Sequence, residues 1–417
     1  MSERPKRRRL ILAGLAGVAA AGGGAGAWYL SRKVYPERGG IRVEGAAVAE
    51  RRVLGRTGLE VGVVGIGAGR IDDIDLLARA ADLGMNYIDT ATCYGDSEDV
   101  IGRALAAHKG LRDKLVIATK WDPAANTPKD QILASLDKSL TRMGIDHVDV
   151  MQTHWLGGGH RGLPGDDGYN RLANEALYAA MDEAKKAGKV RFFGATSHAA
   201  DRSGILRHAI EKKAFDMILV KMNVLDFADA GGPDLLKAAK AADVGVVVMK
   251  SQAEGGAMPP GFENSQYNVF QANLRWVLRH DVACVVHSSI GTSAEAQDAA
   301  ASATKEAFSS RDAELLEDYA TALSPHYCRG CEGGCHDACP DGLAVAPVLR
   351  ARLYARQYGW PEHARSLWER LPIARRESDR CASCSACSDA CPYGVDAAGR
   401  MRDARALFGG GRQGIGT

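Results

Sequence analysis

The sequence predicts an α/β fold: a (β/α)8 barrel of the TIM type, followed by a small, mostly helical domain rich in cysteine. Eight short apolar segments alternate with amphipathic segments of helical length over about 250 residues, as in such barrels. Eight of the ten cysteines lie between Cys328 and Cys391. The glycine run Gly65-x-Gly67-x-Gly69 lacks the pattern of an open dinucleotide-binding sheet, so a closed barrel is favoured.

The predicted strands are short, rich in β-branched residues and nearly continuous, as expected for strands buried on both faces of a parallel sheet. In chain order they are Val61–Ile66, Asn86–Ile88, Leu115–Thr119, Val148–Gln152, Val190–Gly194, Asp216–Val220, Val244–Met249 and Ala283–Val286. Among the predicted helices, Lys129–Met143 has apolar residues at helical spacing. Thr127-Pro128 supplies its cap and first-turn proline.

The N-terminus has the pattern of a targeting segment. Lys6-Arg7-Arg8-Arg9 precedes an uncharged stretch rich in Gly and Ala, and Arg7-Arg8-x-Leu10-Ile11 fits a twin-arginine export signal. The apolar run of about 20 residues is also long enough for an uncleaved membrane anchor, and a basic, structureless leader is a third interpretation. We expect export to the periplasm, or anchoring in the inner membrane facing the periplasm.

The resulting domain organisation has five parts. We expect a signal or anchor at 1–30, a linker at 31–50, the barrel at 51–324, the cysteine domain at 325–405 and a disordered, Gly-rich tail at 406–417. The net charge of +2 is too balanced to indicate a nucleic-acid partner. Membrane contact is expected only through the N-terminal segment.

Polar residues stand at the carboxyl ends of three predicted strands, where barrel enzymes place their catalytic groups. Asp89, Lys120 and His154 end the second, third and fourth strands, and Tyr94 lies in the loop after Asp89. Each alone has an ordinary explanation: a loop charge, a core histidine, a packed ring. Together they deliver four titratable groups to one rim, which predicts a reaction site.

The residues around these four resemble the aldo/keto reductase family. Gly84-x-Asn86-x-x-Asp89-Thr90-Ala91, followed by Tyr94-Gly95 and Ser97-Glu98, is similar to the segment that opens the active site in that family. The resemblance extends from about Arg51 to Ala303. It implies a small-molecule carbonyl or alcohol substrate, with Tyr94 as proton donor, Lys120 lowering its pKa, Asp89 holding Lys120 and His154 orienting the substrate oxygen.

The same resemblance implies NADP(H) as cofactor, with contacts from Gly67, Thr196, Ser197, Lys250, Gly291, Thr292, Ser293 and Gln297. The loop after the eighth strand would cradle phosphate through its backbone N–H groups. The family's usual amide and glutamine are replaced by Ser197 and Leu219, and its adenine-binding pair falls at Ala300-Ala301. We therefore expect an intact catalytic set beside a degraded nucleotide site.

The cysteines form two runs. Cys381-x2-Cys384-x2-Cys387-x3-Cys391-Pro392 has the bacterial ferredoxin spacing, and Cys328-x2-Cys331-x3-Cys335-x3-Cys339-Pro340 is a variant with one added residue. Zinc, or disulfides outside the cytoplasm, are the alternatives. The runs favour two [4Fe–4S] clusters, and the sequence leaves open whether Cys339 and Cys391 are exchanged between them.

Between the runs, Val345–Tyr358 and Pro361–Leu371 are predicted helices. With its cysteine runs this module, like His198 after the fifth strand, resembles the iron–sulfur branch of the aldo/keto reductases. Two functions follow as hypotheses. The first is a reductase whose clusters link two-electron hydride chemistry to a one-electron redox protein partner. The second is an electron-transfer protein whose barrel is a non-catalytic scaffold.

Three further residues have two interpretations each. Cys93 lies in the site loop, and a small buried side chain is a simpler explanation for it than a nucleophile. Trp121 and Trp155 follow Lys120 and His154, so each either walls a substrate pocket or packs at the rim.

Overall fold

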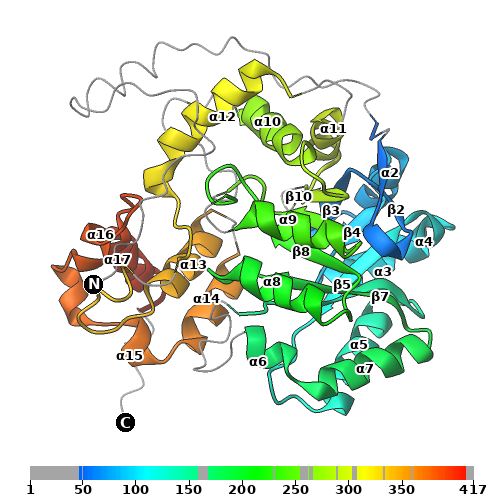
Figure 1. Cartoon of the computed structure of the whole chain (residues 1–417), viewed down its shortest axis with the longest axis horizontal. Helices are drawn as coiled ribbons and strands as arrows, with labels where there is room; N and C mark the ends of the chain where they lie inside the picture. The colour runs from blue at the N-terminus through cyan, green and yellow to red at the C-terminus, as the bar shows by residue number, and fades with distance from the viewer. Residues whose placement is uncertain are drawn as a thin grey trace.

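The computed structural model describes residues 47–48, 50–157, 168–228, 231–253, 262, 266–287, 290–302, 308–331, 334–357 and 360–409. Eight parallel strands close into a barrel in the order β10-β3-β4-β5-β6-β7-β8-β9, which confirms the predicted fold (Figure 1). The strands are β3 (Val64–Gly67), β4 (Tyr87–Asp89), β5 (Val116–Trp121), β6 (Val148–Thr153), β7 (Val190–Ser197), β8 (Met217–Lys221), β9 (Gly245–Met249) and β10 (Cys284–His287).

Helices surround the barrel and form the cysteine domain. Those of the barrel are α2 (Leu76–Asp82), α3 (Ser97–Ala107), α4 (Leu111–Lys114), α5 (Lys129–Met143), α6 (Gly168–Leu172), α7 (Glu175–Lys186), α8 (Arg202–Glu211), α9 (Gly232–Ala241), α10 (Gln266–Leu278), α11 (Ser293–Ser302) and α12 (Ser310–Leu323). Helix α5 has the predicted bounds. It buries Ile132, Leu136 and Leu140 and ends at Gly144, whose φ of 62° is left-handed.

The predicted first strand, Val61–Ile66, is wrong as a single element. Strand β2 (Glu60–Gly62) pairs antiparallel with β1 (Arg51–Val53), and the barrel strand β3 begins only at Val64. The intervening Val63 donates its N–H to Glu50 O at 3.2 Å and accepts the Val285 N–H at 2.9 Å, so the chain passes from the hairpin to the barrel at this residue. Residues on both sides of the break are buried, and an apolar run therefore cannot reveal it.

The β1–β2 hairpin closes the amino end of the barrel. Leu54, Leu59 and Val61 pack with the side chains that fill the barrel interior. The turn fits closely: a Cβ on Gly55, whose φ is 49°, would lie 2.3 Å from the backbone nitrogen of Gly245. This end of the barrel is therefore closed by packed side chains. At Gly55 only glycine fits the turn without strain.

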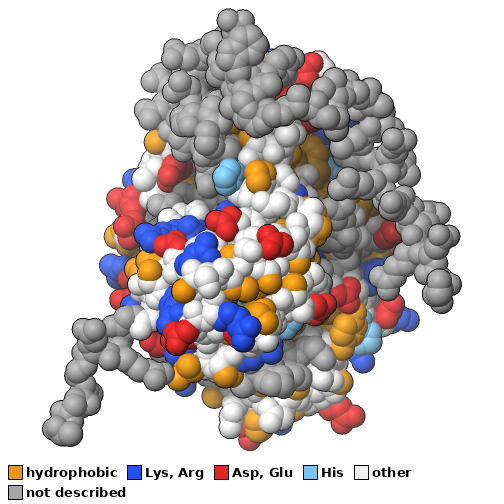
Figure 2. Space-filling view, turned by 90° about the vertical axis from the view of Figure 1, so that its left-hand side faces the viewer, with side chains coloured by type: hydrophobic (Ala, Val, Ile, Leu, Met, Phe, Trp, Pro, Cys, Tyr) orange, Lys and Arg blue, Asp and Glu red, His pale blue; other side chains and the backbone are white. Residues whose placement is uncertain are grey.

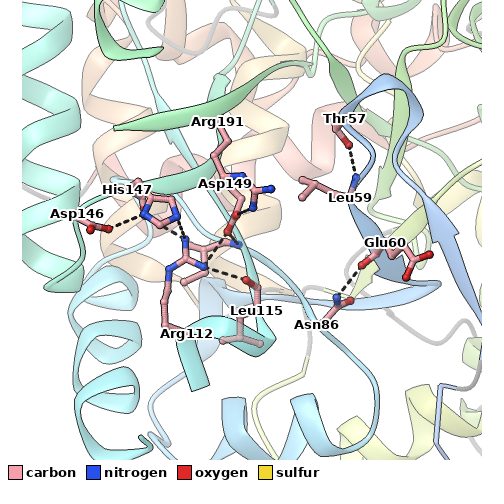
Figure 3. Close-up of polar contacts among 11 residues, drawn as sticks. Thr57, Leu59, Glu60, Asn86, Arg112, Leu115, Asp146, His147, Asp149 and Arg191 are labelled. Carbon is pink, nitrogen blue, oxygen red and sulfur yellow. Dashed lines mark hydrogen bonds and ion pairs between the residues drawn. The ribbon is translucent and has the colours of Figure 1, made fainter. Parts of the chain in front are cut away.

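Buried charge at the amino end is paired (Figure 3). Asp149, near the start of β6, lies 3.1 Å from Arg112 Nη1 and 2.5 Å from Arg191 Nη1. It also accepts the Ile117 backbone N–H at 2.9 Å. Two arginines and one amide thus satisfy a carboxylate that is only 1 % exposed, so it is stabilised where it is buried.

The cysteine domain packs against the carboxyl end of the barrel, with α13 and α14 nearest to it (Figure 1). Its helices are α13 (Val345–Arg356), α14 (Pro361–Arg370), α15 (Ile373–Arg376), α16 (Ala386–Asp389) and α17 (Ala397–Phe408), so both predicted helices are present. The barrel residue Trp155 belongs to this domain's hydrophobic core. The two parts therefore share a packed interface.

The chain ends differ from the sequence expectation in one respect. Helix α17 continues to Phe408, which is buried, so the first residues of the predicted disordered tail are helical. The rest of that tail beyond 409, the leader at 1–30 and the linker up to 46 lie outside the described residues. In the described part of the chain, no helix is both long and apolar enough to cross a membrane.

Candidate active site

Lys120 and Asp89 form a buried ion pair at the carboxyl rim of the barrel. Asp89 is the last residue of β4 and Lys120 lies near the end of β5, so adjacent parallel strands bring them together. Lys120 Nζ lies 2.7 Å from Asp89 Oδ2 and donates to Thr90 O at 2.6 Å. Their exposed fractions are only 1 % and 4 %, so the ammonium group is held in one position.

Tyr94 and His154 complete the predicted set. Lys120 Nζ lies 4.8 Å from the centre of the Tyr94 ring, and the His154 ring lies 6.3 Å away, nearly perpendicular to it. His154 is buried just after β6, whereas Tyr94 is half-buried. Asp89 and Tyr94 line a cavity of about 530 Å³. The four residues therefore converge as predicted, with the phenol on the side that a ligand can reach.

Gln152 belongs to this site, although the sequence analysis did not single it out. Its Nε2 donates to Asp89 Oδ1 at 2.7 Å. Gln152 and His154 are two residues apart, so the strand period places both on one side of β6. That spacing was the available signal. Asp89 is thus held by two donors, one on each oxygen.

The cysteine domain supplies one wall of the cavity. Tyr354 from α13, with Trp360 and His363 at the start of α14, lines it beside Tyr94. The Trp360 ring lies 6.1 Å from the Tyr94 ring and stacks on Tyr354 at 5.6 Å. It also packs on the barrel at Gly69, where a Cβ would approach it to 3.0 Å. A ligand at Tyr94 would therefore contact both domains.

The two rim tryptophans have different roles. Trp155 lines the cavity. Trp121 stacks on Phe193 at 5.8 Å within the core and donates to Thr153 Oγ1 at 3.2 Å, so it is a packing residue. Burial raises the pKa of Cys93 to about 11, which keeps its thiol protonated near neutral pH and disfavours a nucleophilic role.

Some of the predicted nucleotide-binding residues lie at the cavity and others do not. Gly67 and Lys250 line the cavity of the catalytic set. Thr196 Oγ1 is buried without a hydrogen-bond partner among the described residues, as a ligand-binding hydroxyl would be. Ser197 Oγ instead donates to Leu156 O at 2.5 Å, so it is committed to the fold. Gln297 is exposed on α11.

The predicted phosphate loop already holds a carboxylate. The backbone N–H groups of Gly291 and Thr292 donate to Glu295 Oε2 at 2.9 Å and 3.0 Å, and Thr292 Oγ1 donates to the same oxygen at 3.1 Å. Ser293 begins α11 directly afterwards. The loop thus has the anion-binding form that was predicted, but Glu295 must move before a phosphate can use these donors.

The fourth cysteine of each run lies with the first three of the other. Cys339, Cys381, Cys384 and Cys387 line one cavity of about 300 Å³. Burial, and then the neighbouring Cys328, Cys331, Cys391 and Cys387, raise the pKa of Cys335 to about 12, and Cys391 also raises the pKa of Cys331, so Cys391 lies near the first three cysteines of the other run. The structure thus supports the exchange of Cys339 and Cys391 that the sequence left open.

The two four-thiol sites fit iron–sulfur clusters by their donor sets. Backbone N–H groups of Leu343 and Val395 donate to Cys339 Sγ and Cys391 Sγ at 3.3 Å and 3.4 Å. Hydrogen bonds to sulfur are among the features that set cluster potentials. No three His, Cys, Asp or Glu side chains in the described residues are arranged to hold a single metal ion.

Comparison with known proteins finds a matching family model for the barrel and another for the cysteine domain. The model of the aldo/keto reductase family matches residues 65–307. The chain belongs to the aldo/keto reductase family. The model of a 4Fe-4S dicluster domain matches residues 327–395, which include all eight clustered cysteines, from Cys328 to Cys391. This aldo/keto reductase therefore carries an iron–sulfur domain after its barrel.

Individual relatives match part of the chain. L-galactose dehydrogenase of Arabidopsis thaliana is 28 % identical over 221 residues, covering 49 % of this chain and 66 % of that protein. NADH-specific methylglyoxal reductase of Escherichia coli is 30 % identical, covering 37 % and 49 %. The chain thus spans about half to two thirds of these relatives' lengths. A thermostable aldo-keto reductase solved with the inhibitor epalrestat is 25 % identical, with a TM-score of 0.51 over 65 % of this chain and 99 % of the other.

Proposed function

We propose that this chain is an oxidoreductase that interconverts carbonyl and alcohol groups on a small molecule, with Tyr94 as proton donor. The proximity of Tyr94 to the buried Lys120–Asp89 pair, beside a cavity, carries this proposal. Reductase and dehydrogenase relatives of the barrel support the reaction class.

The proton step follows from this geometry. A free phenol has a pKa near 10 and is a weak acid at neutral pH, so it needs a nearby cation to stabilise its anion. Lys120 supplies that charge, and Asp89 and Thr90 hold it in place. As hydride adds to the carbonyl carbon, the π electrons move to oxygen, which takes the Tyr94 proton. His154, whose ring lies 6.3 Å from that of Tyr94, orients that oxygen.

NADP(H) is the proposed source of the hydride, and it would supply that hydride when bound. Gly67, Thr196 and Lys250 are the residues whose positions fit this role. The phosphate loop fits only after Glu295 has moved. We therefore expect weaker nucleotide binding than in an aldo/keto reductase with an open loop.

Replacing Tyr94 by Phe tests the proposal. The ring and its contact with Trp360 remain, while the transferable proton is removed. Reduction of aldehydes by the holoprotein should fall by about 10²- to 10⁴-fold, the usual contribution of general acid catalysis. Nucleotide oxidation is the measurement, and iron content shows that the clusters are retained. Turnover equal to wild type would contradict the role of Tyr94.

The two four-cysteine sites are proposed to hold two [4Fe–4S] clusters that pass single electrons to a redox protein partner. Figure 2 shows Lys and Arg side chains, with Asp and Glu side chains among them, on the face turned to the viewer, and exposed arginines of the cluster domain include Arg375, Arg380 and Arg402. Such a surface favours an acidic partner. Eight iron and eight sulfide per chain are expected, and a preparation that contains only zinc would refute the clusters.

A second candidate function is an electron-transfer protein with a non-catalytic barrel. The contact of Glu295 with the phosphate loop favours it, because that contact opposes nucleotide binding. Anaerobic titration of the holoprotein with NADPH and NADH separates the two. Nucleotide binding followed by bleaching of cluster absorbance supports the coupled reductase, and no binding of either nucleotide supports the scaffold.

Export is proposed from the N-terminal pattern alone. A twin-arginine route would carry the protein after its clusters have been inserted in the cytoplasm. Changing Arg7 and Arg8 to Lys should retain the protein in the cytoplasm, whereas the unchanged protein should fractionate with periplasm or inner membrane. Cytoplasmic protein with an intact Met1 would contradict this proposal.

A further inference from the structure

A second cavity lies between the barrel mouth and the cluster domain. Its empty volume, open solvent at its mouth included, is about 600 Å³, and Cys328 lines it together with basic side chains from both parts: His198, Lys221, Lys250, Arg350 and Arg400. His198, Lys221 and Lys250 stand at the ends of β7, β8 and β9, and the two arginines come from α13 and α17. Basic groups from five elements thus converge on one space.

Among the described residues that line this cavity, there are basic side chains and no carboxylate. Asp226 is the carboxylate nearby, and it is already paired with Lys221 at 2.6 Å and Arg202 at 3.3 Å. Arg350 Nη2 donates to His198 O at 3.3 Å. Its buried Nη1 has no hydrogen-bond partner among the described residues. A buried guanidinium nitrogen without an acceptor is unfavourable unless a ligand supplies one.

Lys250 has an unfavourable backbone conformation. Its φ of 56° lies in the left-handed region, which is unfavourable for a residue with a side chain. Its ammonium nitrogen lies 2.9 Å from the Tyr354 hydroxyl of the cluster domain. Burial, and then Arg350, lower the pKa of Lys250 to about 7. Unfavourable backbone conformation and crowded charge at one residue are typical of ligand-binding positions.

We propose that this cavity binds the carboxylate of the substrate, so that the preferred substrates are carbonyl compounds that carry an acid group. This rests on the proposed function, because His198 and Lys250 line both this cavity and the one that contains Tyr94. A molecule whose carbonyl lies at Tyr94 can therefore extend its acid toward Lys250 and Arg350. The site is separate from the phosphate loop at Gly291.

Binding of two matched compounds to anaerobic holoprotein tests the proposal. The acid 4-formylbenzoate and its neutral analogue 4-formylbenzamide differ only in charge at one end, and calorimetry measures both without any turnover. The acid should bind about tenfold more tightly or better, as expected for charge-assisted pairing with an arginine. Equal affinities for acid and amide would overturn the proposal.

Variants locate the effect. Arg350→Gln should remove most of the preference for the acid and leave the affinity for the amide unchanged, and Lys250→Met should also reduce the preference for the acid. Arg365→Gln is the control, because Arg365 is exposed on α14 and its ion pair is with Glu369. A preference that persists in both Arg350→Gln and Lys250→Met would overturn the site. The wild-type comparison remains decisive if a variant does not fold.

Two further readouts separate the alternatives. If Arg350→Gln weakens NADPH but not the acid, the charge serves the nucleotide phosphates and the proposal is wrong. If it changes only cluster absorbance, the charge serves the cluster near Cys328 and the proposal is again wrong. Failure of the proposed function would look different: the acid would bind preferentially, but neither aldehyde would be reduced.

Discussion

The two ends of the barrel treat charge in opposite ways. At the amino end, Asp149 has two arginines and an amide as partners, and a hairpin closes the interior (Figure 3). At the carboxyl end, Trp155 and Lys250 have left-handed backbone conformations, and Arg350 Nη1 lacks an acceptor among the described residues. Left-handed residues and buried polar atoms without a partner occur at both ends of the described barrel, as at Asp243 and Arg112 Nε, so the difference lies in how charge is paired: a carboxylate sits between two arginines at the amino end, whereas several cationic groups converge at the carboxyl end.

This difference indicates which end stabilises the fold and which end binds. Barrel enzymes place catalysis at the carboxyl ends of the strands, and residues at the amino end contribute mainly to stability. Cationic groups that converge without enough carboxylates are unfavourable unless a ligand compensates their charge. In this chain the cluster domain adds to the binding end through Tyr354, Trp360 and Arg350. Substitutions at the two ends should therefore have separable effects.

The largest expected effect on stability is at the amino end. Asp149→Ala should lower the free energy of unfolding by about 3 kcal/mol, because Arg112 and Arg191 lose their shared carboxylate and the Ile117 amide loses its acceptor. The rate of carbonyl reduction per folded molecule should be unchanged. Urea unfolding and turnover of the folded protein are the measurements.

Tyr94→Phe is the matched variant at the other end. It should retain the wild-type urea midpoint while carbonyl reduction is lost. Asp149→Asn is a milder control at the amino end, since its amide oxygen still accepts the Ile117 N–H. If Asp149→Ala left the midpoint unchanged, or if Tyr94→Phe lowered it as much, the distinction between the two ends would not hold.

The next effect concerns pH at the carboxyl end. Lysine carries its charge below its pKa, and burial with Arg350 lowers the pKa of Lys250 to about 7. Affinity for 4-formylbenzoate should therefore be highest below pH 7 and fall as the pH rises through it. A total loss of about tenfold is expected for one charge interaction. Calorimetry across this range is the measurement.

The other titratable groups that face Lys250 change charge in different pH ranges. Burial lowers the pKa of His198, so it stays neutral near pH 7. Burial also lowers the pKa of Lys221 to about 8, so affinity for the acid should fall a second time as the pH rises through 8. Burial raises the pKa of Tyr354 to about 12. Lys250→Met should abolish the step near pH 7, and Arg350→Gln should move it upward. Affinity that rises with pH would contradict this account.

Local patterns predicted the barrel and the convergence of Asp89, Tyr94, Lys120 and His154 at its rim. Short β-branched runs and helical spacing are encoded by neighbouring residues, and Asp89, Lys120 and His154 stand at strand ends whatever else the chain does. The break at Val63 was missed because an apolar run has no marker for a change of sheet. Gln152 could have been predicted from the sequence, since it shares a face of β6 with His154.

Contacts between distant segments were not predictable in this way. Trp360 meets Tyr94 only because the cluster domain docks on the rim, and Arg350 joins Lys250 for the same reason. No periodicity in residues 345–371 indicates which barrel residues these helices will contact. The predicted phosphate loop shows a different limit: its backbone donors were anticipated correctly, but the acceptor four residues after Gly291 was not.

That acceptor leads to the smallest expected effect. Glu295→Gln keeps an oxygen for the Gly291 and Thr292 donors but removes the charge that competes with phosphate. NADPH should bind about three- to tenfold more tightly, which corresponds to the roughly 1 kcal/mol typical of an exposed charge interaction. Glu314→Gln, which removes an exposed carboxylate on α12, controls for net charge alone. Equal changes in the two variants would mean that Glu295 acts only through long-range charge. A gain specific to Glu295→Gln would instead show that the loop is a nucleotide site held closed by its own helix.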